Sequence, residues 1–125
     1  WGYDNRTTGL RIPDADPENY RIENRFPGAD VNPYLSIAAT LACGFLGMKN
    51  KVKPTKAYEG NAYEQDFDVP RNLEEALRGL QENSEITQIF GDKFIQLYTS
   101  IKLVEFEQFN QVISSWEREH LLLNV

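Results

Sequence analysis

Charged and apolar side chains alternate along YRIENRFP, residues 20–27, in a way that could build a binding face for anions. Arg21, Glu23 and Arg25 fall on one side of the repeat, and mainly apolar residues fall on the other. This period of two is typical of a β-strand, in which successive side chains point to opposite faces. Taken alone, such a pattern is most often a half-buried strand with a solvated outer face. The alternative is a face on which two guanidinium groups and a carboxylate bind a ligand.

A second strand-like run, TTGLRIP, precedes this one, and the turn-forming residues of DADPEN separate the two. We therefore predict an antiparallel hairpin over residues 7–26. In the predicted register Arg11 lies opposite Arg21, and Gly9 lies opposite Glu23, on the same side of the pair. Because like charges opposite each other destabilise a sheet, this register favours an anion bound between the two guanidinium groups.

Composition limits the classes of partner that the chain can bind. Its 125 residues are enough for one hydrophobic core. The 13 Lys and Arg residues against 19 Asp and Glu residues give a net charge of −6, which disfavours nucleic acid and anionic membranes as partners. One cysteine and one histidine exclude a disulfide framework and a His-rich metal site, and they fit a cytoplasmic location. The most apolar run, YLSIAATLACGFLGM, is shorter than the roughly 20 residues that span a bilayer.

Capping residues predict where the helices begin. Asn32 followed by Pro33 predicts the start of a helix over about 32–48, and its apolar composition predicts that this helix is buried. Asn72 and Glu75 form a capping-box pattern that opens a helix over 72–82. Two further helices are predicted over 85–90 and 92–118, and residues 53–71 are predicted to form a long loop of the kind that is often functional.

These elements predict an α+β fold, with an N-terminal antiparallel hairpin followed by a helix-rich region that ends in a long helix. The contact face of that long helix is predicted from residues at three- and four-residue intervals: Phe94, Leu97, Tyr98, Ile101, Glu105, Gln108, Val112 and Trp116.

Three linked motifs, NRTTGLRIP, RIENRFP and NPYLSIAATLACGFLGMKNK, resemble a known family. They are closely similar to the C-terminal part of glutamine synthetases, whose members carry NR[ST]xxxRIP, RxExRFP and xANPYLxxAAxLxAGxxGIxNK. The match is strong over residues 1 to about 52 and looser over the remaining helices. The chain starts at Trp1 without an initiator methionine, and we expect residues 1–125 to be a C-terminal portion of the family's catalytic domain.

The resemblance implies an ATP-dependent ligase that joins ammonia to the γ-carboxylate of L-glutamate through γ-glutamyl phosphate, giving glutamine. It implies that Arg6 contacts the transferring phosphate and the glutamate, that Arg11 and Arg21 bind ATP phosphates, and that Arg25 binds glutamate. Glu23 is implied as a ligand of Mg²⁺ or Mn²⁺, which prefer hard oxygen donors. Family members are homo-oligomers with active sites between subunits, and their other metal ligands lie upstream, so the piece alone is expected to be inactive.

Two alternatives to glutamine synthesis stay open from the sequence. The ending WEREHLLLNV resembles the branch of γ-glutamylpolyamine synthetases, in which an amine replaces ammonia. The other alternative is a non-catalytic assembly module.

The chain departs from many bacterial members at Glu18, where they carry a nucleotide-binding lysine. Tyr63 matches the position of a regulatory tyrosine only in part, so a plain loop tyrosine is the favoured interpretation.

Overall fold

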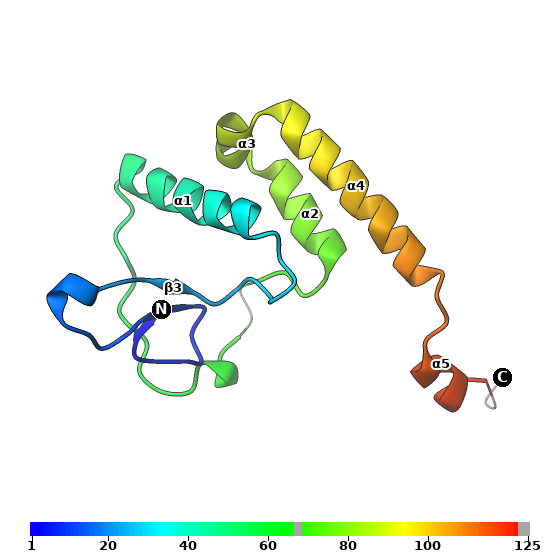
Figure 1. The fold of residues 1–125 in the computed structure, drawn as a ribbon, viewed down its shortest axis with the longest axis horizontal. Helices are drawn as coiled ribbons and strands as arrows, with labels where there is room; N and C mark the ends of the chain where they lie inside the picture. Colours follow the sequence, from blue (N-terminus) through cyan, green and yellow to red (C-terminus); the bar gives the residue numbers. More distant parts are fainter. Residues whose placement is uncertain (67–68, 123–125) are drawn as a thin grey trace. The chain divides into compact units, whose positions relative to one another are not determined.

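The computed structural model describes residues 1–66 and 69–122, and the chain divides into two compact units between Asp68 and Val69 (Figure 1). The first unit holds a small sheet and one long helix, and the second holds helices, so the predicted α+β class is confirmed. The elements of the first unit are β1 (Gly2–Tyr3), β2 (Leu10–Ile12), η1 (Pro17–Asn19), β3 (Glu23–Asn24), α1 (Pro33–Lys49) and η2 (Ala62–Glu64). Those of the second are α2 (Leu73–Glu82), α3 (Ser84–Phe90), α4 (Asp92–Asn110) and α5 (Ser115–His120).

The sheet has the order β1-β2-β3, with β1 parallel to β2 and β2 antiparallel to β3. The predicted hairpin register is wrong by two residues, because Arg11 lies opposite Glu23 and not opposite Arg21. A shift of two leaves every side chain on its predicted face, so alternation alone does not distinguish the two registers. The observed register places opposite charges across the ladder, which is favourable. Arg11 and Arg21 are therefore not opposed across the ladder, and the predicted anion between them is not needed to balance like charges.

The paired strands are shorter than the predicted hairpin arms, but the antiparallel pairing continues beyond them. The backbone N–H of Arg25 donates to the carbonyl of Gly9 at 2.8 Å. A Cβ atom on Gly9 would lie 2.1 Å from the ring of Phe26. Glycine at this position therefore lets the aromatic ring lie directly against the backbone just before β2.

Helix α1 begins as its capping residues predict. The Asn32 side-chain oxygen accepts from the backbone N–H groups of Tyr34 at 3.0 Å and Leu35 at 3.3 Å. The prediction that this helix is buried is wrong for the described residues, since Tyr34, Leu41 and Met48 are all largely exposed. Three short strands are too small to cover a helix that is apolar on several sides.

The second unit packs α2 and α3 against α4. The predicted Asn72 cap is confirmed, because its side-chain oxygen accepts from the N–H of Glu75 at 2.8 Å. The predicted contact face of α4 is wrong in part, since Leu97 is exposed whereas Thr99 is buried. The Thr99 hydroxyl is tolerated there because it donates to the carbonyl of Ile95 at 2.8 Å, one turn earlier.

The predicted helix over 92–118 is interrupted. Helix α4 ends at Asn110, and α5 starts after Ser114. Ser114 and Glu117 form a reciprocal capping box, in which the Glu117 carboxylate accepts from the Ser114 N–H at 2.7 Å. This cap stabilises a new helix start, so the chain turns there instead of continuing α4. None of the helices in the described part of the chain combines the length and the hydrophobicity that a bilayer span requires.

Candidate functional site

The sheet region groups four charged side chains into one chain of ion pairs that includes Arg11. Its Nη1 donates to Oε2 of Glu23 at 2.8 Å, and its Nη2 donates to the Asp4 carboxylate. Arg21 Nη2 donates to the other carboxylate oxygen of Glu23 at 3.2 Å. We call Asp4, Arg11, Arg21 and Glu23 the Arg11 cluster. Arg11 is its most buried member, with a side chain only 12% exposed.

Three members of the Arg11 cluster, Asp4, Arg11 and Glu23, stabilise one another's charged forms. The hydrogen bond from Arg11 lowers the pKa of Glu23, and Arg21 lowers it further. The hydrogen bond from Arg11 also lowers the pKa of Asp4. The two carboxylates in turn raise the pKa of Arg11 above its usual value, with Glu23 making the larger contribution. Asp4, Arg11 and Glu23 therefore favour their ionised forms at neutral pH.

Arg11 keeps donor groups that a ligand could use. Each of its terminal nitrogens carries two N–H groups, and one bond from each is committed to a carboxylate. Its Nε atom is buried and has no hydrogen-bond partner among the described residues. A guanidinium held from two sides is preorganised, so it can meet a phosphate oxygen with little reorganisation.

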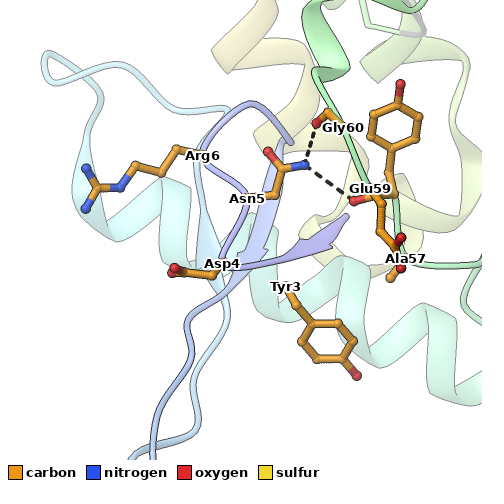
Figure 2. Close-up of a pocket in the computed structure, with 8 residues that line it drawn as sticks. Tyr3, Asp4, Asn5, Arg6, Ala57, Glu59 and Gly60 are labelled. Carbon is orange, nitrogen blue, oxygen red and sulfur yellow. Dashed lines mark hydrogen bonds between the residues drawn. The ribbon is translucent and has the colours of Figure 1, made fainter.

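Arg6 follows the strand β1 and lines an open pocket of about 490 Å³ (Figure 2). The other lining residues are Tyr3, Asp4, Asn5 and residues 57–60. Figure 2 shows the Arg6 side chain extending away from the 57–60 segment, on the same side as Asp4. The positive charge of Arg6 adds to the lowering of the Asp4 pKa that Arg11 dominates. Arg6 is thus coupled electrostatically to the Arg11 cluster through Asp4.

The five residues singled out from the sequence are not all brought into contact. Arg11, Arg21 and Glu23 form ion pairs, and Arg6 lies beside them across Asp4. Arg25 has an exposed side chain, and the ion pairs found among the described residues do not include it. Its role in binding glutamate stays a prediction.

Sequence reasoning missed Asp4 as a partner of Arg11. Its backbone has φ 45°, in the left-handed region that Asp and Asn tolerate better than most residues. This conformation turns the chain directly after β1 and brings the carboxylate to Arg11. The adjacent turn formers Asp4 and Asn5 are the signal that could have predicted the turn.

The described residues fit a divalent cation only as part of its site. Glu23 is ionised and offers the hard oxygen that Mg²⁺ prefers. Both of its oxygens already accept from arginines, and no group of three His, Cys, Asp or Glu residues among the described residues could hold a metal. Glu23 could therefore supply one ligand, while the other ligands of the ion would come from phosphate oxygens, water or other protein segments.

The lowered pKa values predict acid sensitivity that depends on Arg11. Asp and Glu titrate at about 3.9 and 4.3 when unfolded. Folding lowers the pKa values of Asp4 and Glu23, so their ionised forms stabilise the folded protein fully above the unfolded-state pKa values. This contribution to stability is lost as the pH falls through the folded-state pKa values. We expect the urea midpoint of an Arg11→Met variant of the whole protein to fall less steeply below about pH 4.5 than that of the wild type. Equal slopes would contradict this coupling, and Arg78→Met is the matched control on an exposed helix surface.

A sheet face on which arginines meet ionised carboxylates is suited to phosphate groups that bind together with a divalent cation. The chain belongs to the glutamine synthetase family, since the model of the glutamine synthetase catalytic domain matches residues 1–121. The resemblance carried by the three motifs is thereby confirmed, and the family is one of ligases.

Curated relatives include several ligases of this family. A glutamate–isopropylamine ligase from a Pseudomonas species is 40% identical over 121 residues, which is 94% of this chain and 26% of that protein. The γ-glutamylputrescine synthetase PuuA of Escherichia coli is 38% identical over 99% of this chain and 26% of its own length. The type-1 glutamine synthetase 2 of Dictyostelium discoideum is 36% identical over 98% of this chain and 24% of its own length. The chain thus spans about a quarter of the length of these relatives.

Solved structures with the same fold include two of a protein named GmaS. The complex of GmaS with ADP has a TM-score of 0.84 at 30% identity, over 98% of this chain and 28% of that chain. GmaS without ligand has a TM-score of 0.81 at the same identity, over 29% of that chain.

Proposed function

We propose that the protein is an ATP-dependent ligase that joins an amine to the γ-carboxylate of L-glutamate. In the first step a γ-carboxylate oxygen attacks the terminal phosphorus of ATP, and the bond to ADP breaks. The amine nitrogen then attacks the acyl carbon of γ-glutamyl phosphate, inorganic phosphate leaves, and the nitrogen loses a proton. The observation that carries this proposal is the Arg11 cluster, in which a preorganised guanidinium lies against an ionised carboxylate.

Each charged side chain has a physical role in this scheme. Phosphoryl transfer concentrates negative charge on equatorial oxygens, and arginines fixed in advance stabilise that charge without reorganising. Arg11 and Arg21 would bind the phosphates of ATP, and Arg6 would bind the transferring phosphoryl group beside the glutamate. Glu23 would help to hold Mg²⁺ or Mn²⁺, which supplies further positive charge at the phosphates. Arg25, exposed at the end of the ladder, would bind a glutamate carboxylate.

We propose a small primary amine as the acceptor, with ammonia as the second candidate. The relatives whose names specify isopropylamine and putrescine are 40% and 38% identical to this chain. The glutamine synthetases of Dictyostelium discoideum and Staphylococcus aureus are 36% and 30% identical. These values favour the amine branch, which the ending WEREHLLLNV also favours.

The test is phosphate release by the whole protein with MgATP and L-glutamate, comparing ammonia, isopropylamine, ethanolamine and putrescine as acceptors. Omitting glutamate gives the background rate of ATP hydrolysis. Turnover with an amine but not with ammonia supports the proposed acceptor, and turnover with ammonia alone means glutamine synthesis. If none of the four acceptors supports phosphate release above the background rate, the ligase function is contradicted and an assembly module is favoured.

We also propose that the whole protein acts in the cytoplasm as a homo-oligomer. Large apolar side chains are exposed on α1 and α4, including Tyr34, Met48 and Phe109. Apolar surface of this kind supports further protein contacts. Sedimentation analysis of the whole protein tests the oligomer, and a monomer at micromolar concentration would contradict it.

Replacing Arg25 should raise the KM for glutamate more than the KM for ATP. We expect Arg25→Ala to raise the KM for glutamate by about 10- to 100-fold, which corresponds to losing a hydrogen bond between charged groups. The KM for ATP should change by less than about threefold, because the phosphates bind elsewhere. Steady-state kinetics in the whole protein gives both values, and Arg78→Ala on α2 is the matched control. Equal changes in both KM values would reassign Arg25 to the phosphates.

A further inference from the structure

The turn that carries Arg6 is hydrogen-bonded to a segment far away in the sequence. Residues 1–7 contact residues 55–62 through side-chain hydrogen bonds that join positions 53 to 55 apart. The backbone N–H of Tyr58 also donates to the carbonyl of Trp1 at 2.8 Å. These contacts lie in the predicted loop over 53–71, of which residues 67–68 fall outside the described residues. We call residues 55–62 the anchoring segment.

Asn5 makes the central contact, and its amide group is fully used. Its Nδ2 donates to the carbonyls of Gly60 at 2.9 Å and Tyr58 at 3.4 Å (Figure 2). Its Oδ1 accepts from the backbone N–H of Thr7 at 3.0 Å and from the Thr7 hydroxyl at 2.7 Å. An asparagine side chain has two donor hydrogens and one acceptor oxygen with two lone pairs, so its hydrogen-bonding capacity is filled.

Thr7 closes the contact from the other side of Arg6. Its hydroxyl oxygen accepts from the backbone N–H of Ala62 at 2.8 Å while donating to Asn5. The residues immediately before and after Arg6 are therefore both bonded to the anchoring segment. The Arg6 side chain itself extends the opposite way, as Figure 2 shows.

Glycines on both sides permit this close approach. A Cβ atom on Gly2 would lie 2.8 Å from the carbonyl oxygen of Tyr58, which is backbone and cannot swing away. Gly60 has φ +116°, a conformation that side chains rarely allow, and its carbonyl accepts from Asn5. The sequence thus provides for the contact at both Gly2 and Gly60.

We propose that Asn5 is a positioning residue, which fixes the backbone on either side of Arg6 and thereby sets where the Arg6 guanidinium lies relative to Asp4 and the Arg11 cluster. Asn5 points at the anchoring segment and Arg6 points away from it, so Asn5 acts through the backbone and not by touching a ligand. This inference rests on the proposed ligase function for the role of Arg6. Displacing a reacting group by about 1 Å can cost about 100-fold in rate.

The test uses neutral substitutions in the whole protein. Asn5→Ala removes the bonds to Gly60 and Tyr58, and Thr7→Val removes the hydroxyl with little change in shape. Both are expected to lower kcat by about 100-fold, with a smaller change in the KM for ATP. Thr7→Ser keeps the hydroxyl and should retain activity within about threefold of the wild type. Asn83→Ala is the control, because it removes a capping bond to Ile86 in the second unit and should leave kcat unchanged.

Amide hydrogen exchange gives a second readout that needs no turnover. Asn5→Ala should speed exchange at residues 6–8 and 58–62, and Asn83→Ala should not. Faster exchange with an unchanged kcat would mean that the contact only stabilises the fold, which overturns the positioning role. Unchanged exchange would overturn the contact itself. A wild-type protein without turnover but with exchange that depends on Asn5 would contradict the proposed function, while supporting the anchoring of the Arg6 turn.

Discussion

Replacing Arg11 with lysine is expected to lower kcat/KM for ATP by about 100- to 1,000-fold while the protein stays folded. Arg11 bonds Glu23 and Asp4 with two separate nitrogens and keeps further N–H groups for a ligand. Lysine carries one compact ammonium group, which cannot hold two carboxylates in the same fork and also donate to a phosphate. Steady-state kinetics with ATP as the varied substrate measures the loss.

Two controls separate this effect from general damage. Arg78→Lys changes the same residue type on α2, where Arg78 is exposed and contacts Glu74 only weakly at 3.6 Å. Circular dichroism and thermal unfolding of Arg11→Lys show whether the fold is kept. A folded variant that retains kcat/KM within about threefold would contradict the placing of Arg11 at the phosphates.

Glu23→Gln is expected to raise the Mg²⁺ concentration needed for half-maximal activity by at least about 10- to 100-fold, with activity partly restored at high Mg²⁺. The amide keeps an acceptor oxygen for Arg11 but loses the negative charge that a hard cation requires. Titrating Mg²⁺ at saturating ATP and glutamate measures the shift.

Asp4→Asn is the matched comparison for Glu23→Gln. Both changes neutralise a carboxylate bonded to Arg11, but only Glu23 is proposed to bind the cation. Asp4→Asn should therefore lower activity without changing the Mg²⁺ requirement. If extra Mg²⁺ fails to restore Glu23→Gln, the carboxylate acts by holding Arg11, and its role as a metal ligand is wrong.

Local signals predicted much of the fold. The caps at Asn32 and Asn72 marked helix starts that the structure places within one residue, because capping depends on neighbouring residues alone. The break after Asn110 followed the same rule, and the pattern of Ser114 and Glu117 would have predicted it. Exposure was harder to predict, since Leu97 and Thr99 sit on a helix whose packing depends on α2.

The candidate site depends on contacts that local patterns do not determine. Alternation placed Arg11, Arg21 and Glu23 on one face, and the structure brings these three together. The residue opposite Arg11 was predicted as Arg21 and is Glu23. A register shift of two residues leaves every side chain on the same face of the sheet, so only the pairing of opposite charges distinguishes the two registers. Asn5 was missed because its partners lie 53 and 55 positions away.

Two of the arginines at this site, Arg11 and Arg21, are paired with carboxylates of the same sheet region. Asp4 and Glu23 match the charges of Arg11 and Arg21, so these four side chains sum to zero. Bare guanidinium groups would attract chloride and free phosphate, which are abundant competitors in any cell. Because the net charge of the Arg11 cluster is zero, a ligand gains little there from charge alone and must offer several oxygens in the right places at once. The charge balance within the Arg11 cluster thus disfavours single small anions relative to a ligand with several oxygens.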